Sequence, residues 1–347
     1  MKKIKVLVVE DSLVFRNLLV QSLEKDNALE VVATASDPFE ARDKIIKYKP
    51  DVMTLDIELP RMDGLEFLRK LMPQYPMPVV VISALSEKVF DAMKAGAVDF
   101  VAKPAVADRK QLDSFLCNEL PVKIKVASTA RVSRYKKPVM FDNNYSTSSK
   151  SETNLIAIGA STGGTEAIAE VLKNFSTDIP GTVVVQHMPP KFTEMYANRL
   201  DSQCRVKVRE AKNGDIVAKG EVLIAPGGDE QMSVVKIADN YQVVLKKGER
   251  VNGHCPSVDV LFNSVAEAAG SHAIGIILTG MGRDGAKGLL KMKKAGARTI
   301  GQDESTCVVY GMPKAAYDIG AVMYQEKLQS IAPKTYKLIN PELFTAV

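Results

Sequence analysis

The stretch Ile4-Lys5-Val6-Leu7-Val8-Val9-Glu10-Asp11 is the first unit of a repeated β/α pattern. An apolar run that ends in acidic residues is typical of a buried parallel strand whose carboxyl end carries a functional group. Four further runs predict strands at Val31–Ala35, Val52–Asp56, Val79–Ser83 and Phe100–Ala102. Amphipathic segments between them predict helices, for instance at Leu13–Lys25, Phe39–Lys47 and Leu65–Met72. This alternation predicts a small doubly wound α/β domain.

The chain of 347 residues is longer than one hydrophobic core usually organises, so two domains are expected. Residues 1–120 form the first predicted domain. Residues 121–152 carry seven Lys or Arg but only two acids and end in a polar tract, which predicts a linker. A second β/α alternation over residues 153–347 predicts another doubly wound α/β domain with a mainly parallel sheet. Its strand candidates are Leu155–Ile158, Thr182–Gln186, Glu221–Ala225, Val234–Ile237, Gln242–Lys246, Ala273–Thr279 and Thr299–Gly301.

Composition excludes several classes of protein. The net charge of +5 is small for this length, which argues against a nucleic-acid partner. The four cysteines are scattered, as expected for thiols in a reducing compartment. No apolar segment is long enough to span a bilayer, so we expect a cytoplasmic protein without membrane insertion.

Three acidic side chains follow strands of the first domain. Glu10 and Asp11 follow the first strand, and Asp56 ends the third. Because the carboxyl ends of parallel strands meet at one edge of the sheet, these acids are expected to converge there. Clustered carboxylates favour a hard cation, which predicts a Mg²⁺ site. The alternative is that each acid only caps the following helix.

Two more polar residues end strands at the same edge. Ser83 ends the fourth strand, and Lys103 follows the fifth. Carboxylates, a hydroxyl and an ammonium group at one edge form a site for phosphoryl transfer. Asp56 is the expected nucleophile, while Ser83 and Lys103 would bind the phosphate oxygens.

Residues 1–120 closely resemble the flavodoxin-like receiver domain of response regulators. The resemblance covers Glu10-Asp11-Ser12, Asp56, the loop Leu59-Pro60-Arg61-Met62-Asp63-Gly64, Ser83-Ala84 and Lys103-Pro104. It implies that Asp56 accepts phosphate from a histidine kinase and that Phe100 is a switch aromatic. Spacing alone would assign Phe100 to core packing. Glu10 stands where receivers often carry a second aspartate.

A glycine-rich turn opens the second domain. The strand ending at Ile158 runs into Gly159-Ala160-Ser161-Thr162-Gly163-Gly164, and a helical segment follows. A serine between glycines at a strand-to-helix turn can expose its hydroxyl group as a nucleophile, and the helix N-terminus offers N–H donors for an oxyanion. A phosphate-binding loop is the alternative. Neither the acid of a dinucleotide site nor the lysine of a P-loop is present at the required position.

A serine nucleophile needs a base, and the chain has three histidines. His187 follows the strand Thr182–Gln186 and therefore shares an edge with Ser161. His254 lies in the loop Asn252-Gly253-His254-Cys255-Pro256, which could also reach the substrate. His272 precedes a strand and should lie at the opposite edge. Location favours His187 as the base.

Asp284 completes the predicted set. It lies in the turn Thr279-Gly280-Met281-Gly282-Arg283-Asp284-Gly285 after an apolar strand, so it could orient His187 and stabilise its protonated ring. Taken alone, it would be a helix cap. The chain order Ser, His, Asp differs from the order in α/β-hydrolases, so membership of that fold is not implied.

Residues 153–347 resemble the catalytic domain of the CheB methylesterases. The matching stretches are Gly159–Gly164, Gln186-His187-Met188-Pro189, Ala225-Pro226-Gly227-Gly228, Pro256-Ser257-Val258-Asp259 and Thr279–Gly285. The resemblance implies a three-layer α/β hydrolytic domain that demethylates glutamate methyl esters, and often deamidates glutamines, on methyl-accepting chemoreceptors without a cofactor.

Both reactions pass through a tetrahedral oxyanion, and the backbone N–H groups near Thr162 and Met281 are candidates to bind it. A DNA-binding output domain would instead need a basic recognition helix after the linker. A different serine esterase on a receiver is the second alternative. A scaffold whose output domain has lost catalysis is the third, and the presence of Ser161, His187 and Asp284 argues against it.

Overall fold

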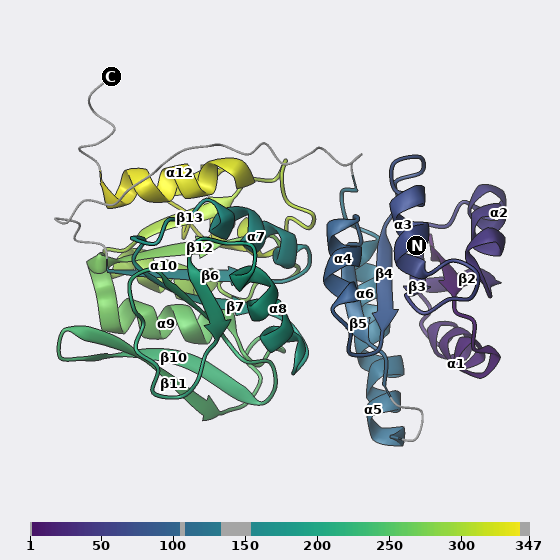
Figure 1. Ribbon diagram of the computed structural model, residues 1–347, viewed down its shortest axis with the longest axis horizontal. Coiled ribbons are helices and arrows are strands. Elements are labelled where there is room, and N and C mark those ends of the chain that lie inside the picture. The colour runs from purple at the N-terminus through teal and green to yellow at the C-terminus, as the bar shows by residue number, and fades with distance from the viewer. Residues whose placement is uncertain (1, 105–107, 133–153, 341–347) are drawn as a thin grey trace. The chain divides into compact units, whose positions relative to one another are not determined.

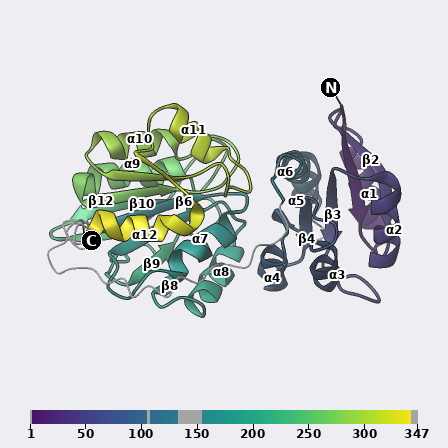
Figure 2. The ribbon, with the colours of Figure 1, turned by 90° about the horizontal axis from the view of Figure 1, so that it is seen from above.

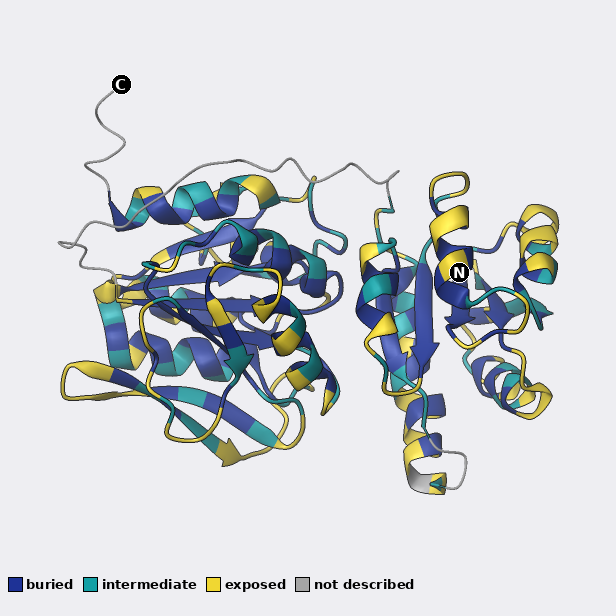
Figure 3. Cartoon of the chain, in the orientation of Figure 1, coloured by how far each residue is buried: buried dark blue, intermediate teal, exposed yellow. Residues whose placement is uncertain are grey.

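The computed structural model describes residues 2–104, 108–132 and 154–340, and the chain divides into two compact units, residues 1–137 and 138–347. Each unit is built around a parallel sheet whose inner strands are almost entirely buried, while its helices keep one face in solvent (Figures 1 and 3). In the described part of the chain, no helix has the length and apolar character that a membrane span requires.

The first unit contains a five-stranded parallel sheet in the order β2-β1-β3-β4-β5. Its strands are β1 (Ile4–Val9), β2 (Leu29–Ala35), β3 (Val52–Asp56), β4 (Val79–Ser83) and β5 (Asp99–Ala102). Its helices are α1 (Leu13–Leu23), α2 (Pro38–Tyr48), α3 (Gly64–Leu71), α4 (Lys88–Lys94), α5 (Arg109–Ser114), the π-helical turn η1 (Phe115–Glu119) and α6 (Leu120–Ala127). Ser12, Asp37 and Asp63 cap α1, α2 and α3 by accepting backbone hydrogen bonds, which fixes where these helices begin.

The predicted linker starts too early, because its first residues form helix α6. The sequence places a tether from residue 121, but residues 120–127 form a helix that buries Leu120, Ile124 and Ala127. These apolar residues recur at helical spacing. The lysines that suggested a solvated tether form ion pairs instead: Lys123 with Asp99 at 2.8 Å and Lys125 with Asp26 at 2.8 Å. Residues 133–152 of the predicted linker lie outside the described residues.

The second unit contains a seven-stranded parallel sheet in the order β14-β13-β12-β6-β7-β9-β8, and an antiparallel hairpin, β10-β11. The sheet strands are β6 (Leu155–Ala160), β7 (Gly181–Gln186), β8 (Lys207–Glu210), β9 (Glu221–Ile224), β12 (Ala273–Ile277), β13 (Arg298–Gln302) and β14 (Tyr324–Glu326). The hairpin joins β10 (Glu230–Ile237) and β11 (Asn240–Lys247).

Helices cover both faces of this sheet. Helices α9 (Val258–Ala269), α10 (Ala286–Lys294) and α11 (Met312–Asp318) lie on one face (Figure 2). Helices α7 (Gly164–Lys173), α8 (Phe192–Asp201) and α12 (Leu328–Ile339) lie on the other, and the short turn η2 (Gly270–His272) precedes β12. The prediction of two α/β units with mainly parallel sheets, the second in three layers, is confirmed. Strands β8 and β14 were missed because they are short, polar edge strands.

The close approach of β6 to α9 yields a stability test. A Cβ atom on Gly159 would lie 2.2 Å from Cγ1 of Val258, so Gly159→Ala forces a clash. We expect Gly159→Ala to lower the free energy of unfolding by about 1–3 kcal/mol, measured by urea unfolding of the full chain. Val258→Ala removes both γ-carbons. The free energy of unfolding of the double variant should therefore fall by less than the sum of the decreases in the two single variants. Strictly additive losses would show that Val258 is not the obstacle.

Candidate functional site

The acidic edge of the first unit has the predicted composition. Glu10 and Asp11 follow β1, Asp56 ends β3, and one carboxylate oxygen from each lies within 4.8 Å of the others. Glu10 and Asp56 are buried, whereas Asp11 is exposed. Three oxygen donors of this kind, one of them in contact with solvent, fit a hard divalent cation that keeps several water ligands.

Lys103 lies against the two buried acids. Its Nζ donates to both Glu10 carboxylate oxygens, at 2.9 and 3.0 Å, and also contacts Asp56. Burial raises the pKa of Glu10 to about 7; the hydrogen bond from Lys103 opposes this shift and the charge of Asp56 adds to it. One ammonium group therefore does not compensate both buried carboxylates, and an added cation would complete the balance.

Ser83 and Phe100 occupy the neighbouring strands. Ser83 pairs with Ala102 at the end of β4, and its buried Oγ has no hydrogen-bond partner in the part of the chain that is described. A buried hydroxyl without a partner is costly, so this one is suited to a ligand oxygen. Phe100 is buried on β5 with its ring 6.3 Å from that of Phe90, edge to face.

Ser161 lies at the turn between β6 and α7. Its N–H donates to the Thr279 carbonyl at 3.0 Å, and its carbonyl accepts from the Gly164 N–H at 2.7 Å and from Gln186 Nε2 at 2.9 Å. Gly163 adopts φ +76° at this turn, a conformation that favours glycine. The backbone of Ser161 is thus tied to the last residue of β7 and to the loop that follows β12.

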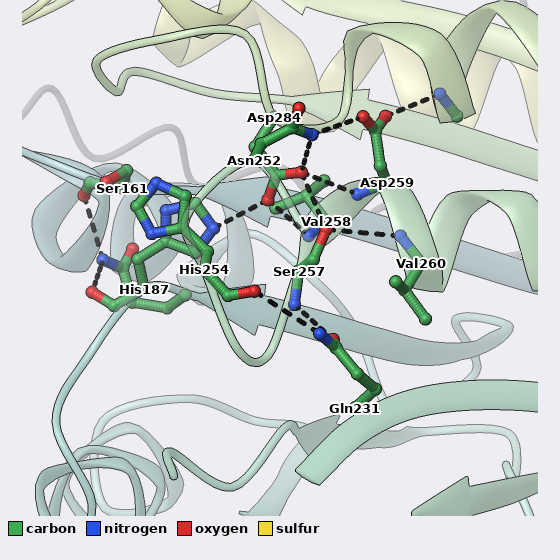
Figure 4. A network of polar contacts seen from close by, with 12 residues as sticks. Ser161, His187, Gln231, Asn252, His254, Ser257, Val258, Asp259, Val260 and Asp284 are labelled. Carbon is green, nitrogen blue, oxygen red and sulfur yellow. Dashed lines mark hydrogen bonds and ion pairs between the residues drawn. The ribbon is translucent and has the colours of Figure 1, made fainter. Parts of the chain in front are cut away.

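His187 and Asp284 come together as predicted. His187 Nε2 lies 2.9 Å from Asp284 Oδ2, and the buried Nδ1 has no hydrogen-bond partner among the described residues. Figure 4 shows imidazole rings between Ser161 and the Asp284 carboxylate. The structure therefore gathers Ser161, His187 and Asp284 at the carboxyl edge of one sheet, and Nδ1 is the ring nitrogen of His187 that Asp284 does not use.

Asp284 is held by the start of α9 as well as by His187. Its carboxylate accepts hydrogen bonds from Ser257 Oγ at 2.7 Å, from the Val258 and Asp259 N–H groups at 2.7 and 3.2 Å, and from Asn252 Nδ2 at 2.9 Å. Burial opposes its ionisation, but the hydrogen bond and charge of His187, with further bonds from Asn252 and Ser257, hold the pKa of Asp284 well below its usual range. The carboxylate is therefore ionised whenever the protein is folded at neutral pH.

The other two histidines lie at different places relative to the site. His272 directly precedes β12, and its carbonyl accepts from the Asn154 N–H at 2.9 Å, so it lies at the opposite edge of the sheet from Ser161. The ring of His254 stacks on that of His187. The expected position of His272 is thus confirmed, and His254, which the sequence left open, lies beside His187.

Three residues of the site escaped the sequence analysis as functional groups. Gln186 Nε2 donates to the carbonyls of Ser161 and His187, at 2.9 and 3.1 Å, and so ties these two residues together. A Cβ atom on Gly164 would lie 2.1 Å from Gln186 Oε1, which explains the second glycine of the turn. Ser257, in a Ser-Val-Asp helix start, could have been found as a cap. No sequence signal marks Asn252.

The predicted oxyanion residues lie on the same edge. Thr162 follows Ser161 and is buried, whereas Met281, in the loop after β12, is 45% exposed. A Cβ atom on Gly280 would lie 2.7 Å from Cβ of Ser161, so this loop passes close to the serine. The assignment of an oxyanion site to Thr162 and Met281 stays a prediction.

Fold and sites together define a class: a receiver unit joined to a hydrolytic unit of α/β architecture, with Ser, His and Asp at the carboxyl edge of its sheet. Residues 6–114 match the family described as response regulator receiver domain, and residues 156–335 match the family described as CheB methylesterase. The chain therefore belongs to the CheB methylesterase family, and it is a carboxylic ester hydrolase.

Similar proteins cover nearly the whole chain. A protein-glutamate methylesterase/protein-glutamine glutaminase 2 of Syntrophomonas wolfei is 60% identical over 343 residues, which are 98% of this chain and 99% of that protein. The protein-glutamate methylesterase/protein-glutamine glutaminase of Syntrophotalea carbinolica is 50% identical over 349 residues, 98% of each chain. The crystal structure of the Thermotoga maritima CheB methylesterase catalytic domain covers 54% of this chain and 99% of that one, with 38% identity and a TM-score of 0.53.

The hydrogen bonds to Asp284 predict its effect on stability. Asp284→Ala leaves the groups that it binds without an acceptor, so the free energy of unfolding at pH 7 should fall by about 3–5 kcal/mol. Asp284→Asn keeps the shape of the side chain, so its free energy of unfolding should fall by less than that of Asp284→Ala. Because folding lowers the pKa of Asp284, its stabilisation is complete above the unfolded-state pKa of about 4 and declines below it. Urea unfolding should therefore show the Ala deficit shrinking from pH 6 to pH 3; a deficit independent of pH would contradict this role.

Proposed function

We propose that this protein hydrolyses γ-glutamyl methyl esters, and deamidates glutamines, on the cytoplasmic domains of methyl-accepting chemoreceptors. The names of the relatives, protein-glutamate methylesterase/protein-glutamine glutaminase, support methyl-esterified glutamates and glutamines of a protein as the substrates. The observation that carries the proposal is the His187 ring, held by the buried Asp284 through Nε2 and turned so that Nδ1 has no other partner in the described structure. That arrangement is what a general base for a neighbouring serine requires.

In the proposed reaction, Ser161 Oγ attacks the ester or amide carbonyl as His187 Nδ1 takes its proton. Asp284 stabilises the resulting imidazolium, and the backbone N–H groups of Thr162 and Met281 bind the oxyanion. His187 then gives the proton to the leaving methanol or ammonia, which leaves an acyl-enzyme. Water activated by His187 hydrolyses the acyl-enzyme to the glutamate side chain. These steps require no cofactor.

The receiver unit is proposed to control this activity. Asp56 accepts a phosphoryl group from a chemotaxis histidine kinase, and Ser83 and Lys103 bind its oxygens, with Phe100 responding to the change. Glu10, Asp11 and Asp56 would hold Mg²⁺, which supplies charge neutralisation for phosphoryl transfer when bound. Phosphorylation of Asp56 then raises the rate of demethylation and so contributes to chemotactic adaptation in the cytoplasm.

Loss of the nucleophile tests the catalytic assignment. Ser161→Ala should lower the rate of methanol release from methylated receptor membranes by about 10⁶-fold, the size of effect seen when a triad serine is removed from a protease. His187→Ala should be similarly inactive, while His272→Ala, at the other edge of the sheet, should retain activity. Near-normal methanol release by a folded Ser161→Ala protein would exclude a serine mechanism.

Phosphorylation is tested separately. Acetyl phosphate with Mg²⁺ should label the wild-type chain and accelerate methanol release, because both depend on Asp56. Asp56→Asn should be neither labelled nor accelerated, yet should keep its basal activity since Ser161 and His187 are intact. Labelling that persists in Asp56→Asn would place the phosphorylation site elsewhere.

A further inference from the structure

The ring of His254 lies flat against the ring of His187. The two ring centroids are 3.6 Å apart and the planes differ by only 9° (Figure 4). His254 comes from the loop between β11 and α9, whereas His187 follows β7. A stack this close and this parallel brings one broad face of the His187 ring into contact with a second flat group.

A tight turn holds His254 in this place. Val251 and His254 exchange two backbone hydrogen bonds, both of 3.0 Å, around Asn252 and Gly253. These central residues have φ of +53° and +87°, the signs found in a type I′ turn. Gln231 on β10 fixes the same loop, since its Nε2 donates to the carbonyls of Glu249 at 2.8 Å and His254 at 3.4 Å.

The turn also reaches the other partner of His187. Asn252 Nδ2 donates to Asp284 Oδ1 at 2.9 Å and to Asp259 Oδ2 at 2.8 Å. One four-residue turn therefore contacts the imidazole through His254 and the carboxylate through Asn252. Its position sets both the ring and the acid that binds it.

The two contacts on His187 constrain different degrees of freedom. The hydrogen bond to Asp284 fixes the position of Nε2, but the ring can still pivot about that atom. The lone pair of Nδ1 lies in the ring plane, so a pivot moves it away from the proton that it must accept. A flat neighbour on one face restricts the plane and thereby the direction of Nδ1.

We propose that His254 is a positioning residue, which fixes the ring plane of His187 so that Nδ1 is aimed at Ser161. This inference rests on the proposed role of His187 as the base. It requires the flat face of the residue at position 254, not its ability to carry a proton. Small errors in the placement of a reacting group reduce rates by up to about 100-fold, which sets the size of the expected effect.

Three substitutions of His254 distinguish the effect of its flat ring from the effect of its polarity. His254→Phe keeps a flat ring without ionisable nitrogen, His254→Gln keeps polarity without a ring, and His254→Leu keeps neither. With the full-length chain and a synthetic peptide that carries a γ-glutamyl methyl ester, kcat should stay near wild type for the Phe variant. It should fall by about 10–100-fold for the Gln and Leu variants, with KM little changed.

His272→Leu is the matched control, because it makes the same change at an exposed histidine on the opposite edge of the sheet, and it should leave kcat unaltered. If the Leu variant fails to fold, the contrast between Phe and Gln still decides. Wild-type kcat in the Gln variant would overturn the inference, as would a Phe variant as slow as the Gln variant. An active His187→Ala protein would instead refute the proposed base itself.

Discussion

The buried carboxylate of Asp284 is the constraint on which the catalytic unit depends. A buried charge is tolerated only when hydrogen bonds replace its hydration. Here they come from the N-terminus of α9, from the Asn252 side chain and from His187. The loops after β7, β11 and β12 must therefore meet around one oxygen pair, and this meeting brings the imidazole to the turn that carries Ser161.

In both units, buried carboxylates lie at the carboxyl edge of a parallel sheet, but the hydrogen-bond donors and cations around them differ. Asp284 is well supplied with donors, so its pKa is lowered and it is ionised at neutral pH. Glu10 shares one ammonium group with Asp56, and burial raises its pKa to about 7. A satisfied carboxylate is suited to hold an imidazolium through a reaction. Glu10 and Asp56 share one ammonium group, and a carboxylate pair of this kind is suited to bind a further cation and a phosphoryl group.

The sequence alone determined both folds and most of the polar groups at the sheet edges. Buried parallel strands appear in the sequence as apolar runs, and the last residues of these strands lie at one edge of the sheet. The ends of β3 and β4 were predicted to the residue. The same rule led to the prediction of Ser161, His187 and Asp284 as site residues, since each follows a strand. The rule failed where local composition misleads: the lysines of α6 suggested a tether because their acidic partners, Asp99 and Asp26, are distant in sequence.

Which side chains contact one another depends on tertiary packing. Nothing local in the sequence shows that Asn252 would bridge Asp259 and Asp284, or that His254 would stack on His187. Such contacts join a turn after β11 to loops after β7 and β12, and their geometry follows from how α9 packs on the sheet. The sequence thus determined which chemical groups stand at the edge, because strand ends are local features. Their mutual orientation depends on packing between distant segments, which no local pattern records.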